Sequence, residues 1–453
     1  MAQAMRNEGL AAKTLIVGLG ATGLSCARFL ARQGGEVAVA DSRSEPPGLD
    51  ALNAEYPDIA VFLGPFDDRL FESADRLVVS PGVPVATPQI DAARKRGVPV
   101  MGDIELFVRA AQAPVVAITG SNGKSTVTTL LGEMARANGI RVAVGGNIGT
   151  PALDLLDDSV ELYVLELSSF QLETTDSLQA AVATVLNVSP DHMDRYADLG
   201  AYAAAKQRVM QGAGVGVYNA DDPIVAAMSG ADDAWYFTLG ESQNDKTFGV
   251  CSIDGEDYLC RGEQPLLAAE ELKIPGLHNR ANALSALAMG TALGFDLGSL
   301  LEVLRSFRGL PHRTEYVAEI NAVRWYNDSK GTNVGASIAA LEGLHRGDDT
   351  RTVLIAGGDC KGADFSALAP VLSTCARAVV LIGRDAASVA AVVPVSMQLV
   401  MAADMDEAVT RAAEFALPGD RVLLSPACAS FDMFSGYAQR GDRFMQAVRR
   451  LAR

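Results

Sequence analysis

The segment TGSNGKST (Thr119–Thr126) follows the β-rich run PVVAI and precedes a helical pattern that starts at Val127. A glycine-rich turn between a strand and a helix directs backbone N–H groups toward one point, where they bind phosphate oxygens. In that setting Lys124 would neutralise the terminal phosphates of a nucleotide, and the Ser125 hydroxyl would bind Mg²⁺. The segment therefore predicts an ATP site on a strand–turn–helix unit.

The loop differs from the common G-x-x-x-x-G-K pattern, because isoleucine stands at position 118 where that pattern has glycine. The glycine–lysine–serine core and its strand–helix setting remain. A coincidental turn would not explain why a lysine and two hydroxyl side chains open the helix. We expect the nucleotide phosphates to be bound by Gly120, Ser121, Asn122, Gly123, Lys124, Ser125 and Thr126.

Around this loop, short apolar runs such as TLIVGLG, LYVLELSS and TVLIAGG alternate with helical patterns along nearly the whole chain. Such runs are typical of buried parallel strands that helices cover on both faces. They fall into three groups, and the 453 residues agree with about 100–200 residues per domain. We predict an α/β protein of three domains, which span residues 1–102, 103–309 and 310–453.

A second glycine-rich loop, GLGATG (Gly18–Gly23), also follows a strand and opens a helical run. This is a G-x-G-x-x-G pattern, which favours a diphosphate at the helix N-terminus. Asp41 ends the next strand, where a ribose-binding acid is expected. NAD, another nucleotide diphosphate such as a UDP-sugar, and a tight turn without any ligand all remain open. Ser80-Pro81-Gly82 either lines the same crevice or forms a simple turn.

Composition excludes several classes of protein. A net charge of −17 and a pI near 4.7 argue against a nucleic-acid-binding protein. The six cysteines include no C-x-x-C pair, which argues against a disulfide framework or a zinc cluster and favours a reducing compartment. The N-terminus lacks a signal-peptide pattern, and no stretch of about 18 apolar residues follows. We expect a cytoplasmic monomer without a membrane partner.

The motif TGSNGKST resembles the ATP loop of the Mur ligases and of their folylpolyglutamate synthetase relatives. Five further segments match the Mur ligases in order and extend the resemblance from about residue 13 to residue 445. They are LELSSFQLE (165–173), NVSPDHMDRY (187–196), GLPHR (309–313), NDSKGTN (327–333) and SPACASFD (425–432). The resemblance implies an N-terminal Rossmann-like domain for UDP rather than NAD, a central P-loop ATPase-like domain, and a C-terminal Rossmann-like domain that closes over ATP and an amino acid.

Within the family, SSFQLE and SPACASFD favour the branch that uses D-glutamate. The resemblance implies an ATP-dependent ligase that adds D-glutamate to UDP-N-acetylmuramoyl-L-alanine, through an acyl phosphate, in peptidoglycan precursor synthesis. ATP, Mg²⁺, D-glutamate and the UDP-linked precursor are then its expected ligands.

The resemblance also implies catalytic roles for four residues. Lys124 and Glu166 would act at ATP and its magnesium, and His192 would bind a second magnesium. Lys206 would be carbamylated by CO₂, which turns an ammonium into an oxygen ligand for Mg²⁺. The metal ligands would then be Ser125, Glu166, His192 and Lys206. Considered alone, these residues could be a turn cap, a structural histidine and a solvated helix lysine.

The remaining expected contacts follow from the same motifs. For ATP they are Asn282 at the adenine and Arg313 and Asp328 at the domain junction. For the UDP-linked substrate they are Gly20, Ala21, Thr22, Asp41, Arg43, Ser80 and Gly82, with Asn147 near the reacting end. For D-glutamate they are Thr332, Lys361, Ser430 and the backbone near Tyr437.

Three kinds of alternative function remain at this stage. The first is another ligase of the family, either a Mur ligase that adds a different amino acid or a folate ligase, which would lack the N-terminal Rossmann-like domain. A regulatory ATPase would hydrolyse ATP without ligation. An NAD dehydrogenase would use the first glycine loop, but nothing after residue 102 supports it.

Overall fold

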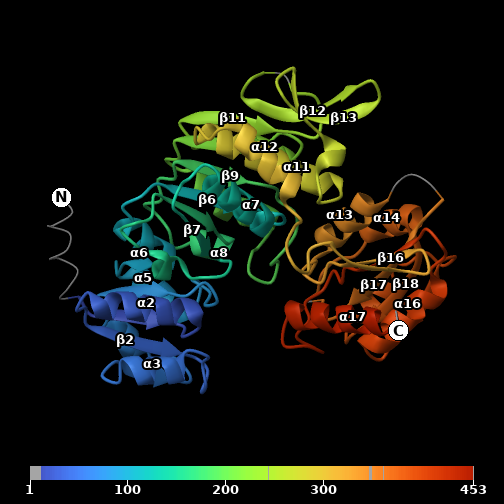
Figure 1. The fold of residues 1–453 in the computed structure, drawn as a ribbon. Coiled ribbons are helices and arrows are strands. Elements are labelled where there is room, and N and C mark those ends of the chain that lie inside the picture. Colours follow the sequence, from blue (N-terminus) through green and yellow to red (C-terminus); the bar gives the residue numbers. More distant parts are fainter. Residues whose placement is uncertain (1–11, 243, 346–348, 361, 452–453) are drawn as a thin grey trace.

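The computed structural model describes residues 12–451 except 243, 346–348 and 361. The described residues form three sheets, each covered by helices, and Figure 1 shows them as three lobes. The N-terminal lobe, in blue, and the C-terminal lobe, in red, both lie below the central lobe. The predicted fold class, α/β with three domains, is confirmed.

The N-terminal sheet has the order β3-β2-β1-β4-β5, and every neighbouring pair is parallel. Its strands are β1 (Thr14–Val17), β2 (Val37–Asp41), β3 (Ala60–Leu63), β4 (Arg76–Val79) and β5 (Val100–Met101). Its helices are α2 (Ala21–Arg32), α3 (Leu49–Glu55), α4 (Asp68–Glu72) and α5 (Pro88–Lys95), and α6 (Asp103–Ala110) follows. The strand order reverses between β1 and β4, which is where doubly wound sheets bind ligands.

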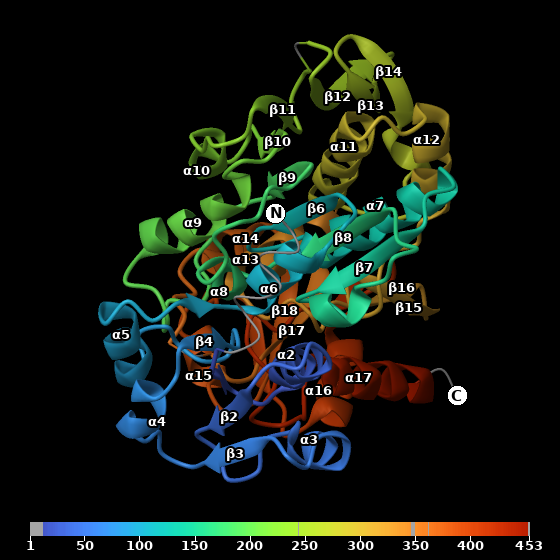
Figure 2. The ribbon, with the colours of Figure 1, turned by 90° about the vertical axis from the view of Figure 1, so that its left-hand side faces the viewer.

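The central sheet has the order β14-β13-β12-β11-β10-β9-β6-β8-β7. Its strands are β6 (Val115–Thr119), β7 (Val142–Gly146), β8 (Leu162–Glu166), β9 (Val182–Val185), β10 (Val215–Asn219), β11 (Asp233–Phe237), β12 (Thr247–Ile253), β13 (Glu256–Arg261) and β14 (Gln264–Ala268). Only β12, β13 and β14 pair in antiparallel fashion among the described strands of this sheet. They lie at the top of the molecule in Figures 1 and 2, far from the lower lobes.

From the ATP-type loop onward, the central domain has six α-helices among the described residues, and the first of them follows that loop directly. They are α7 (Lys124–Ala137), α8 (Ser169–Leu172), α9 (Leu199–Gln207), α10 (Pro223–Ala226), α11 (Leu277–Ala292) and α12 (Leu297–Ser306). Val127, Leu130, Leu131 and Met134 recur along one face of α7 and are fully buried. This face packs with α11 and β6 in one hydrophobic cluster, which fixes the start of α7 at the carboxyl edge of the sheet.

The C-terminal sheet has the order β15-β16-β20-β17-β18-β19, with β15–β16 antiparallel and the other pairs parallel. Its strands are β15 (Glu315–Ile320), β16 (Val323–Asn327), β17 (Thr352–Gly357), β18 (Ala376–Ile382), β19 (Gln398–Met401) and β20 (Arg421–Leu424). Its helices are α13 (Val334–Leu344), α14 (Leu368–Cys375), α15 (Ala386–Ala390), α16 (Met405–Phe415) and α17 (Tyr437–Leu451). The loops after β16, β17 and β20 leave from one edge of this sheet.

One expectation about cysteine is wrong. Sequence analysis argued against a disulfide framework and favoured a reducing compartment, but the described residues contain one disulfide, between Cys251 and Cys260 on β12 and β13. The antiparallel register places Cys251 opposite Tyr258 and Cys260 opposite Gly249, so the two cysteines are diagonal neighbours. A search for C-x-x-C spacing does not detect a pair that a hairpin brings together.

No helix in the part of the chain that the structure describes is both long and apolar enough to cross a bilayer.

Candidate active site

The loop between β6 and α7 is built as the sequence predicted. Gly120 and Gly123 have φ angles of +153° and +84°, which L side chains rarely adopt. A Cβ atom on Gly123 would also lie 2.4 Å from Oδ1 of Asn282. The Asn122 N–H donates to Oδ1 of Asn187 at 2.8 Å, which holds the loop against the chain that follows β9.

Two lysines meet beside this loop. Lys124 Nζ donates to the carbonyl oxygens of Gly120 and Ser121 at 2.8 and 2.9 Å, and Lys206 Nζ donates to the same Gly120 oxygen at 2.8 Å. Lys206 is only 1% exposed. Burial lowers the pKa of both lysines, and Lys124 lowers the pKa of Lys206 further, well below its ordinary value. The loop that would receive a polyphosphate is therefore flanked by two buried amines, of which Lys206 loses its proton the more readily.

Glu166 ends β8 at the same edge of the sheet. Asn147 Nδ2 donates to its Oε1 at 2.7 Å, while its Oε2 is buried without a hydrogen-bond partner. An unpartnered carboxylate oxygen in a buried site is costly unless a cation or donor completes it. Asn147, predicted to contact the UDP-linked substrate, therefore also orients Glu166.

His192 precedes α9 in the chain and has an unusual backbone conformation, with φ at +59°. Its ring contacts Tyr202 and Phe170, with ring centroids 6.4 and 4.9 Å apart. Burial lowers the pKa of His192, and the nearby Asp191 opposes that change. A neutral imidazole is the form that binds a metal.

The described residues contain no group of three or more His, Cys, Asp and Glu side chains placed to hold a metal ion. The predicted magnesium ligands nevertheless fit a hard cation. The bare Glu166 oxygen and the Ser125 hydroxyl are oxygen donors, and a carbamate on Lys206 would add another. Glu166 and Ser125 can therefore hold Mg²⁺ near the ATP-type loop.

The C-terminal domain reaches this loop through the segment after α12. The Arg313 Nη2 atom donates to Ser125 Oγ at 2.7 Å, across 188 positions of sequence. Asp328 Oδ1 accepts from the Thr314 N–H at 3.1 Å, and burial raises the pKa of Asp328 to about 6. Burial also lowers the pKa of Lys330 to about 8. A nucleotide at this junction would thus meet groups from two domains.

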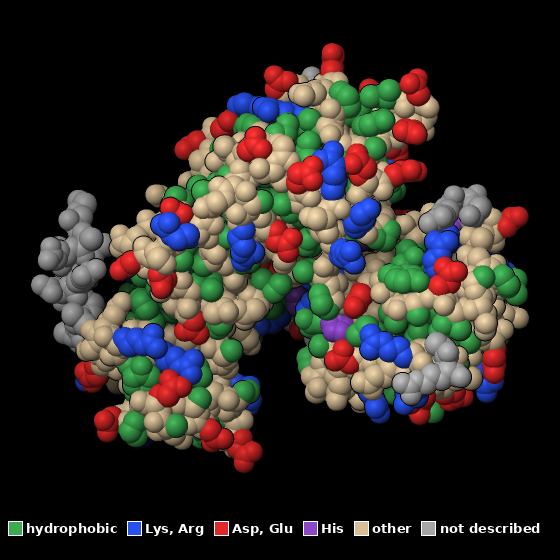
Figure 3. Space-filling model, in the orientation of Figure 1, with side chains coloured by type: hydrophobic (Ala, Val, Ile, Leu, Met, Phe, Trp, Pro, Cys, Tyr) green, Lys and Arg blue, Asp and Glu red, His purple; other side chains and the backbone are tan. Residues whose placement is uncertain are grey.

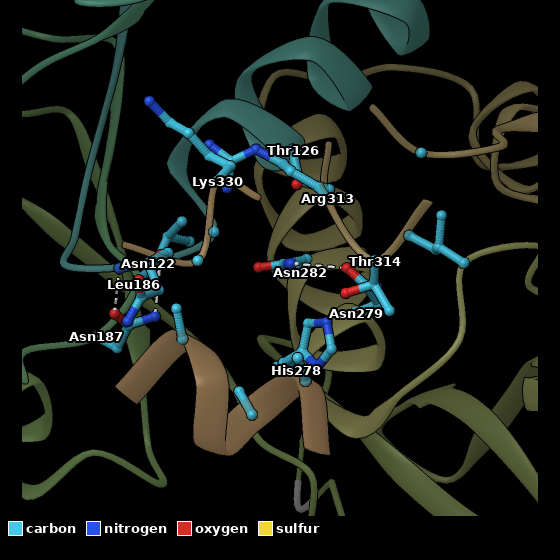
Figure 4. Close-up of a pocket in the computed structure, with 18 of the residues that line it drawn as sticks. Asn122, Thr126, Leu186, Asn187, His278, Asn279, Asn282, Arg313, Thr314 and Lys330 are labelled. Carbon is cyan, nitrogen blue, oxygen red and sulfur yellow. Dashed lines mark hydrogen bonds between the residues drawn. The ribbon is translucent and has the colours of Figure 1, made fainter. Parts of the chain in front are cut away.

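A pocket of about 130 Å³ lies at the junction of the two domains. Figure 4 shows Asn122 and Asn187 on one side of it and His278, Asn279 and Asn282 on the other. Asn282 Nδ2 donates to Asn279 Oδ1 at 3.1 Å. Amide groups on a small, partly apolar pocket suit the edge of a purine base.

The predicted D-glutamate residues come from loops at one edge of the C-terminal sheet. Thr332 follows β16 and is partly buried, Ser430 follows β20 and is buried, and Tyr437 begins α17. The Ala427 N–H donates to the Gly331 oxygen at 2.9 Å and joins the first two loops. Lys361 lies outside the described residues.

The residues predicted for UDP lie on the other lower lobe. Asp41 accepts from the Leu19 N–H at 2.7 Å and from the Arg43 guanidinium at 2.7 and 2.9 Å. Burial disfavours its ionisation, but these donors outweigh it and lower the pKa of Asp41 to about 2. Ser80 Oγ donates to the Gly18 oxygen at 2.7 Å, so it supports the turn.

In the first glycine loop, Gly20 has free space where a side chain would lie, whereas Gly23 has none. A Cβ atom on Gly20 would have no heavy atom within 4 Å, whereas one on Gly23 would lie 1.9 Å from the Gly18 oxygen. Ala21 and Thr22 begin α2 next to the open position, and Gly82 is equally unobstructed. Figure 3 shows a hollow between this lobe and the C-terminal lobe, below the central domain.

Three further residues at the site were not predicted. Lys330 Nζ lies 3.9 Å from the centre of the Tyr437 ring, and Asn333 Nδ2 donates to Asn122 Oδ1 and Asp191 Oδ2, each at 3.2 Å. His278 lines the pocket, and burial lowers its pKa to about 4. Lys330 and Asn333 belong to NDSKGTN, and the density of polar residues in that motif was the available signal.

Comparison with protein families gives three consecutive matches. Residues 12–102 match the Mur ligase MurD-like N-terminal domain, 118–290 the Mur ligase middle domain, and 312–428 the Mur ligase glutamate ligase domain. Together they cover most of the described chain in the order of its three sheets.

Curated relatives match over nearly the full length. UDP-N-acetylmuramoylalanine--D-glutamate ligase from Marinobacter nauticus is 54% identical, covering 96% of this chain and 98% of that protein. The protein of the same name from Nitrosococcus oceani is 54% identical, covering 99% of each. Among solved structures, UDP-N-acetylmuramate-alanine ligase from Thermotoga maritima has a TM-score of 0.60 at 19% identity, covering 97% of this chain and 99% of its own. That likeness concerns the fold.

Proposed function

The chain belongs to the Mur ligase family, and from that premise we propose that it joins D-glutamate to UDP-N-acetylmuramoyl-L-alanine with consumption of ATP. The observation that carries this function is the 54% identity to D-glutamate ligases over 96% of the chain or more. The reaction belongs to the synthesis of peptidoglycan precursors. The roles proposed for individual residues combine the geometry of the site with the resemblance to Mur ligases.

The chemistry proceeds in two steps. The carboxylate of the alanyl end attacks the γ-phosphorus of ATP, the bond to the β-phosphate oxygen breaks, and an acyl phosphate and ADP form. The amine of D-glutamate then attacks the acyl carbon, inorganic phosphate leaves, and the amine loses a proton. Phosphoryl transfer requires no covalent bond between the protein and the substrate. Positioning of the reactants and neutralisation of charge should therefore account for most of the rate enhancement.

The phosphates of ATP are assigned to the loop from Gly120 to Thr126. Lys124 and Arg313 supply positive charge there. Lys124 donates to a carbonyl oxygen of the loop, and Arg313 donates to the Ser125 hydroxyl. Bound magnesium would neutralise the phosphates, and Ser125 and Glu166 would hold it. Asn282 would face the adenine in the pocket, and Asp328 suits the ribose hydroxyls.

Lys206 is assigned a carbamate. Its Nζ is buried and hydrogen-bonds one carbonyl, with no carboxylate among its hydrogen-bond partners in the described part of the chain. Reaction of the uncharged amine with CO₂ forms a carbon–nitrogen bond, releases a proton and leaves an anionic carbamate. This anion would balance Lys124 and provide oxygen atoms for a magnesium ion, which His192 and Glu166 would also hold.

The two remaining substrates are assigned to the lower lobes. The diphosphate of the UDP-linked precursor would lie over Gly20 with Ala21 and Thr22, and its uridine end near Asp41 and Arg43. D-glutamate carries two carboxylates. Lys361, Thr332, Ser430 and the backbone near Tyr437 would receive them. These assignments correspond to domains at 1–102, 103–309 and 310–453, in a monomer that works in the cytoplasm.

Phosphate release tests this function. The enzyme is supplied with ATP, Mg²⁺ and UDP-N-acetylmuramoyl-L-alanine, and D-glutamate is compared with L-glutamate and a panel of other amino acids. We expect release only with D-glutamate, and the product must gain one glutamyl residue by mass. Release of phosphate without an amino acid would indicate an ATPase instead, and preference for another amino acid would indicate another Mur ligase.

A further inference from the structure

Two cysteines face each other at the edge of the C-terminal sheet. Cys360 follows β17 and Cys428 follows β20, and these neighbouring strands are parallel, with Ile355 opposite Leu424. Both cysteines are buried, and their Sγ atoms lie 2.6 Å apart. A disulfide requires about 2.05 Å, so the bond needs a movement of only about half an ångström.

The backbone brings these sulfur atoms together. Asp359 and Ala429 form an isolated antiparallel bridge, with N–H to O distances of 3.0 and 2.9 Å. This bridge sets Cys360 and Cys428 side by side in the two loops. The Cys360 N–H donates to Asp385 Oδ2 at 2.9 Å, and Arg440 Nη1 donates to the Cys428 oxygen at 3.1 Å. The short distance between the two sulfur atoms is therefore set by the backbone of both loops and not only by the side-chain rotamers.

We propose that Cys360 and Cys428 form a reversible disulfide, an oxidation site that links the two loops of the D-glutamate pocket. In cytosolic proteins disulfides are usually transient and redox-sensing. The effect on D-glutamate rests on the proposed function, because Lys361 follows Cys360 directly and Ser430 stands two positions after Cys428. The bond itself rests only on the geometry of the two sulfur atoms.

The oxidant is a low-molecular-weight disulfide such as oxidised glutathione. Cys360 is 6% exposed and Cys428 is 1% exposed, so Cys360 is the first to be reached. Its thiolate attacks one sulfur of the oxidant, a mixed disulfide forms, and one small thiol leaves. Cys428 then loses its proton and attacks the Cys360 sulfur, and the second small thiol leaves. Two protein thiols are oxidised while one disulfide is reduced to two thiols.

The state of the Cys428 thiol agrees with an exchange that begins at Cys360. The neighbouring Cys360 sulfur, together with burial, raises the pKa of the Cys428 thiol. A thiol that stays protonated is a poor nucleophile, so Cys428 acts as the resolving partner and not as the first to react. Once formed, the bond would hold the loops after β17 and β20 in one arrangement.

The test uses the full-length enzyme with Cys251→Ser and Cys260→Ser, which removes the hairpin disulfide. After incubation with oxidised glutathione, trypsin without reduction should yield a linked pair of peptides, residues 352–361 and 422–440, each of which contains a single cysteine. We expect the KM for D-glutamate to rise about tenfold and to return with dithiothreitol. Cys375→Ser should behave like the parent. Cys360→Ser should form no linked peptide and keep its KM under oxidant, whereas Cys428→Ser should form no linked peptide and stop at the mixed disulfide on Cys360, which mass spectrometry detects.

The outcomes separate the two ideas. Absence of the linked peptides after prolonged oxidation would overturn the disulfide. Linked peptides with an unchanged KM for D-glutamate would overturn its connection with the pocket. Lys361→Ala, assayed in the reduced parent enzyme, tests the pocket without any oxidation. An unchanged KM there would remove the proposed D-glutamate assignment, whereas the linked peptides would still establish the bond.

Discussion

The two glycine-rich loops of this chain have the same local form and different surroundings. Each follows a buried strand and opens a helix, at Gly18–Gly23 and at Gly120–Thr126. Beside the first loop the nearest charged pair is Asp41 with Arg43, and Asp41 binds a loop N–H. Beside the second loop stand Lys124, Lys206 and Arg313.

The difference shows that glycine spacing determines the turn, and that the side chains around it determine the ligand. A diphosphate that is held but not cleaved needs backbone N–H groups and little added charge. A triphosphate that loses its terminal phosphoryl group needs cations to balance the charge that moves in the reaction. Four predictions test this contrast.

The largest effect is expected at Lys124. Lys124→Ala should lower kcat by about 10²–10³-fold, because a positive group at the phosphoryl being transferred is lost. Binding of UDP-N-acetylmuramoyl-L-alanine, measured by titration calorimetry, should stay within twofold, since its loop is on another domain. Lys95→Ala is the matched control, because Lys95 is exposed and pairs only with Asp91 on the surface. Loss of precursor binding in a folded Lys124→Ala enzyme would contradict the separation of the two loops.

Lys206→Ala should come next, with a fall in kcat of about 10²-fold, because a magnesium ligand and a balancing charge disappear. A small carboxylate such as acetate should restore part of the activity by occupying the empty anionic position. A carbamate signal from ¹³C-labelled CO₂ should be present in wild type and absent in the variant. Wild-type activity in Lys206→Ala without added carboxylate would rule out the carbamate.

At the first loop, adding a single methyl group to the backbone should be enough to weaken binding of the UDP-linked precursor. Gly20→Ala has room for its methyl group in the ligand-free protein, so its melting temperature should match wild type. Its KM for the UDP-linked precursor should rise about tenfold if a diphosphate approaches that backbone. Gly23→Ala is the contrasting control and should lower the melting temperature, because its methyl group would overlap the Gly18 oxygen. An unchanged KM in Gly20→Ala would place the precursor elsewhere.

The smallest effect concerns acid stability. The folded pKa of Asp41 is about 2, below its ordinary value of 3.8, so its ionised form stabilises the fold above about pH 4. This contribution, about 2 kcal/mol, should disappear as the pH falls from about 4 to about 2. Urea midpoints of wild type and Asp41→Asn should therefore differ at pH 6 and converge near pH 2. A constant difference across that range would show that the Asp41 carboxylate contributes no ionisation-linked stability.

The fold was largely predictable, because most of its elements leave a signal in a short stretch of sequence. Buried parallel strands leave apolar runs, and the turns after β1 and β6 need glycine, so both glycine-rich loops and their helices could be located in sequence. The antiparallel β12–β14 extension and its Cys251–Cys260 bond could not, because strand pairing at an edge depends on register rather than on composition.

The candidate site was only partly predictable. The motifs indicated Lys124 and Glu166, which follow or end the neighbouring parallel strands β6 and β8 and therefore lie at one sheet edge. Lys206 on α9 was indicated only by the resemblance. The contact between Arg313 and Ser125 spans 188 positions and depends on how two domains meet, which spacing does not encode. In NDSKGTN, spacing did not distinguish Lys330 and Asn333, which reach the site, from their neighbours.

The bond from Arg313 to Ser125 also has a consequence for the order of events. Ser125 Oγ is held by a guanidinium at 2.7 Å, and the same oxygen is the proposed magnesium ligand. A magnesium ion at this oxygen would lie beside a guanidinium, so Mg-ATP should draw Arg313 from Ser125 to the phosphates to which it is assigned, while the central and C-terminal domains stay in contact. We expect slower amide hydrogen exchange at residues 310–314 when Mg-ATP binds alone, and unchanged exchange there would show that Arg313 keeps its contact with Ser125.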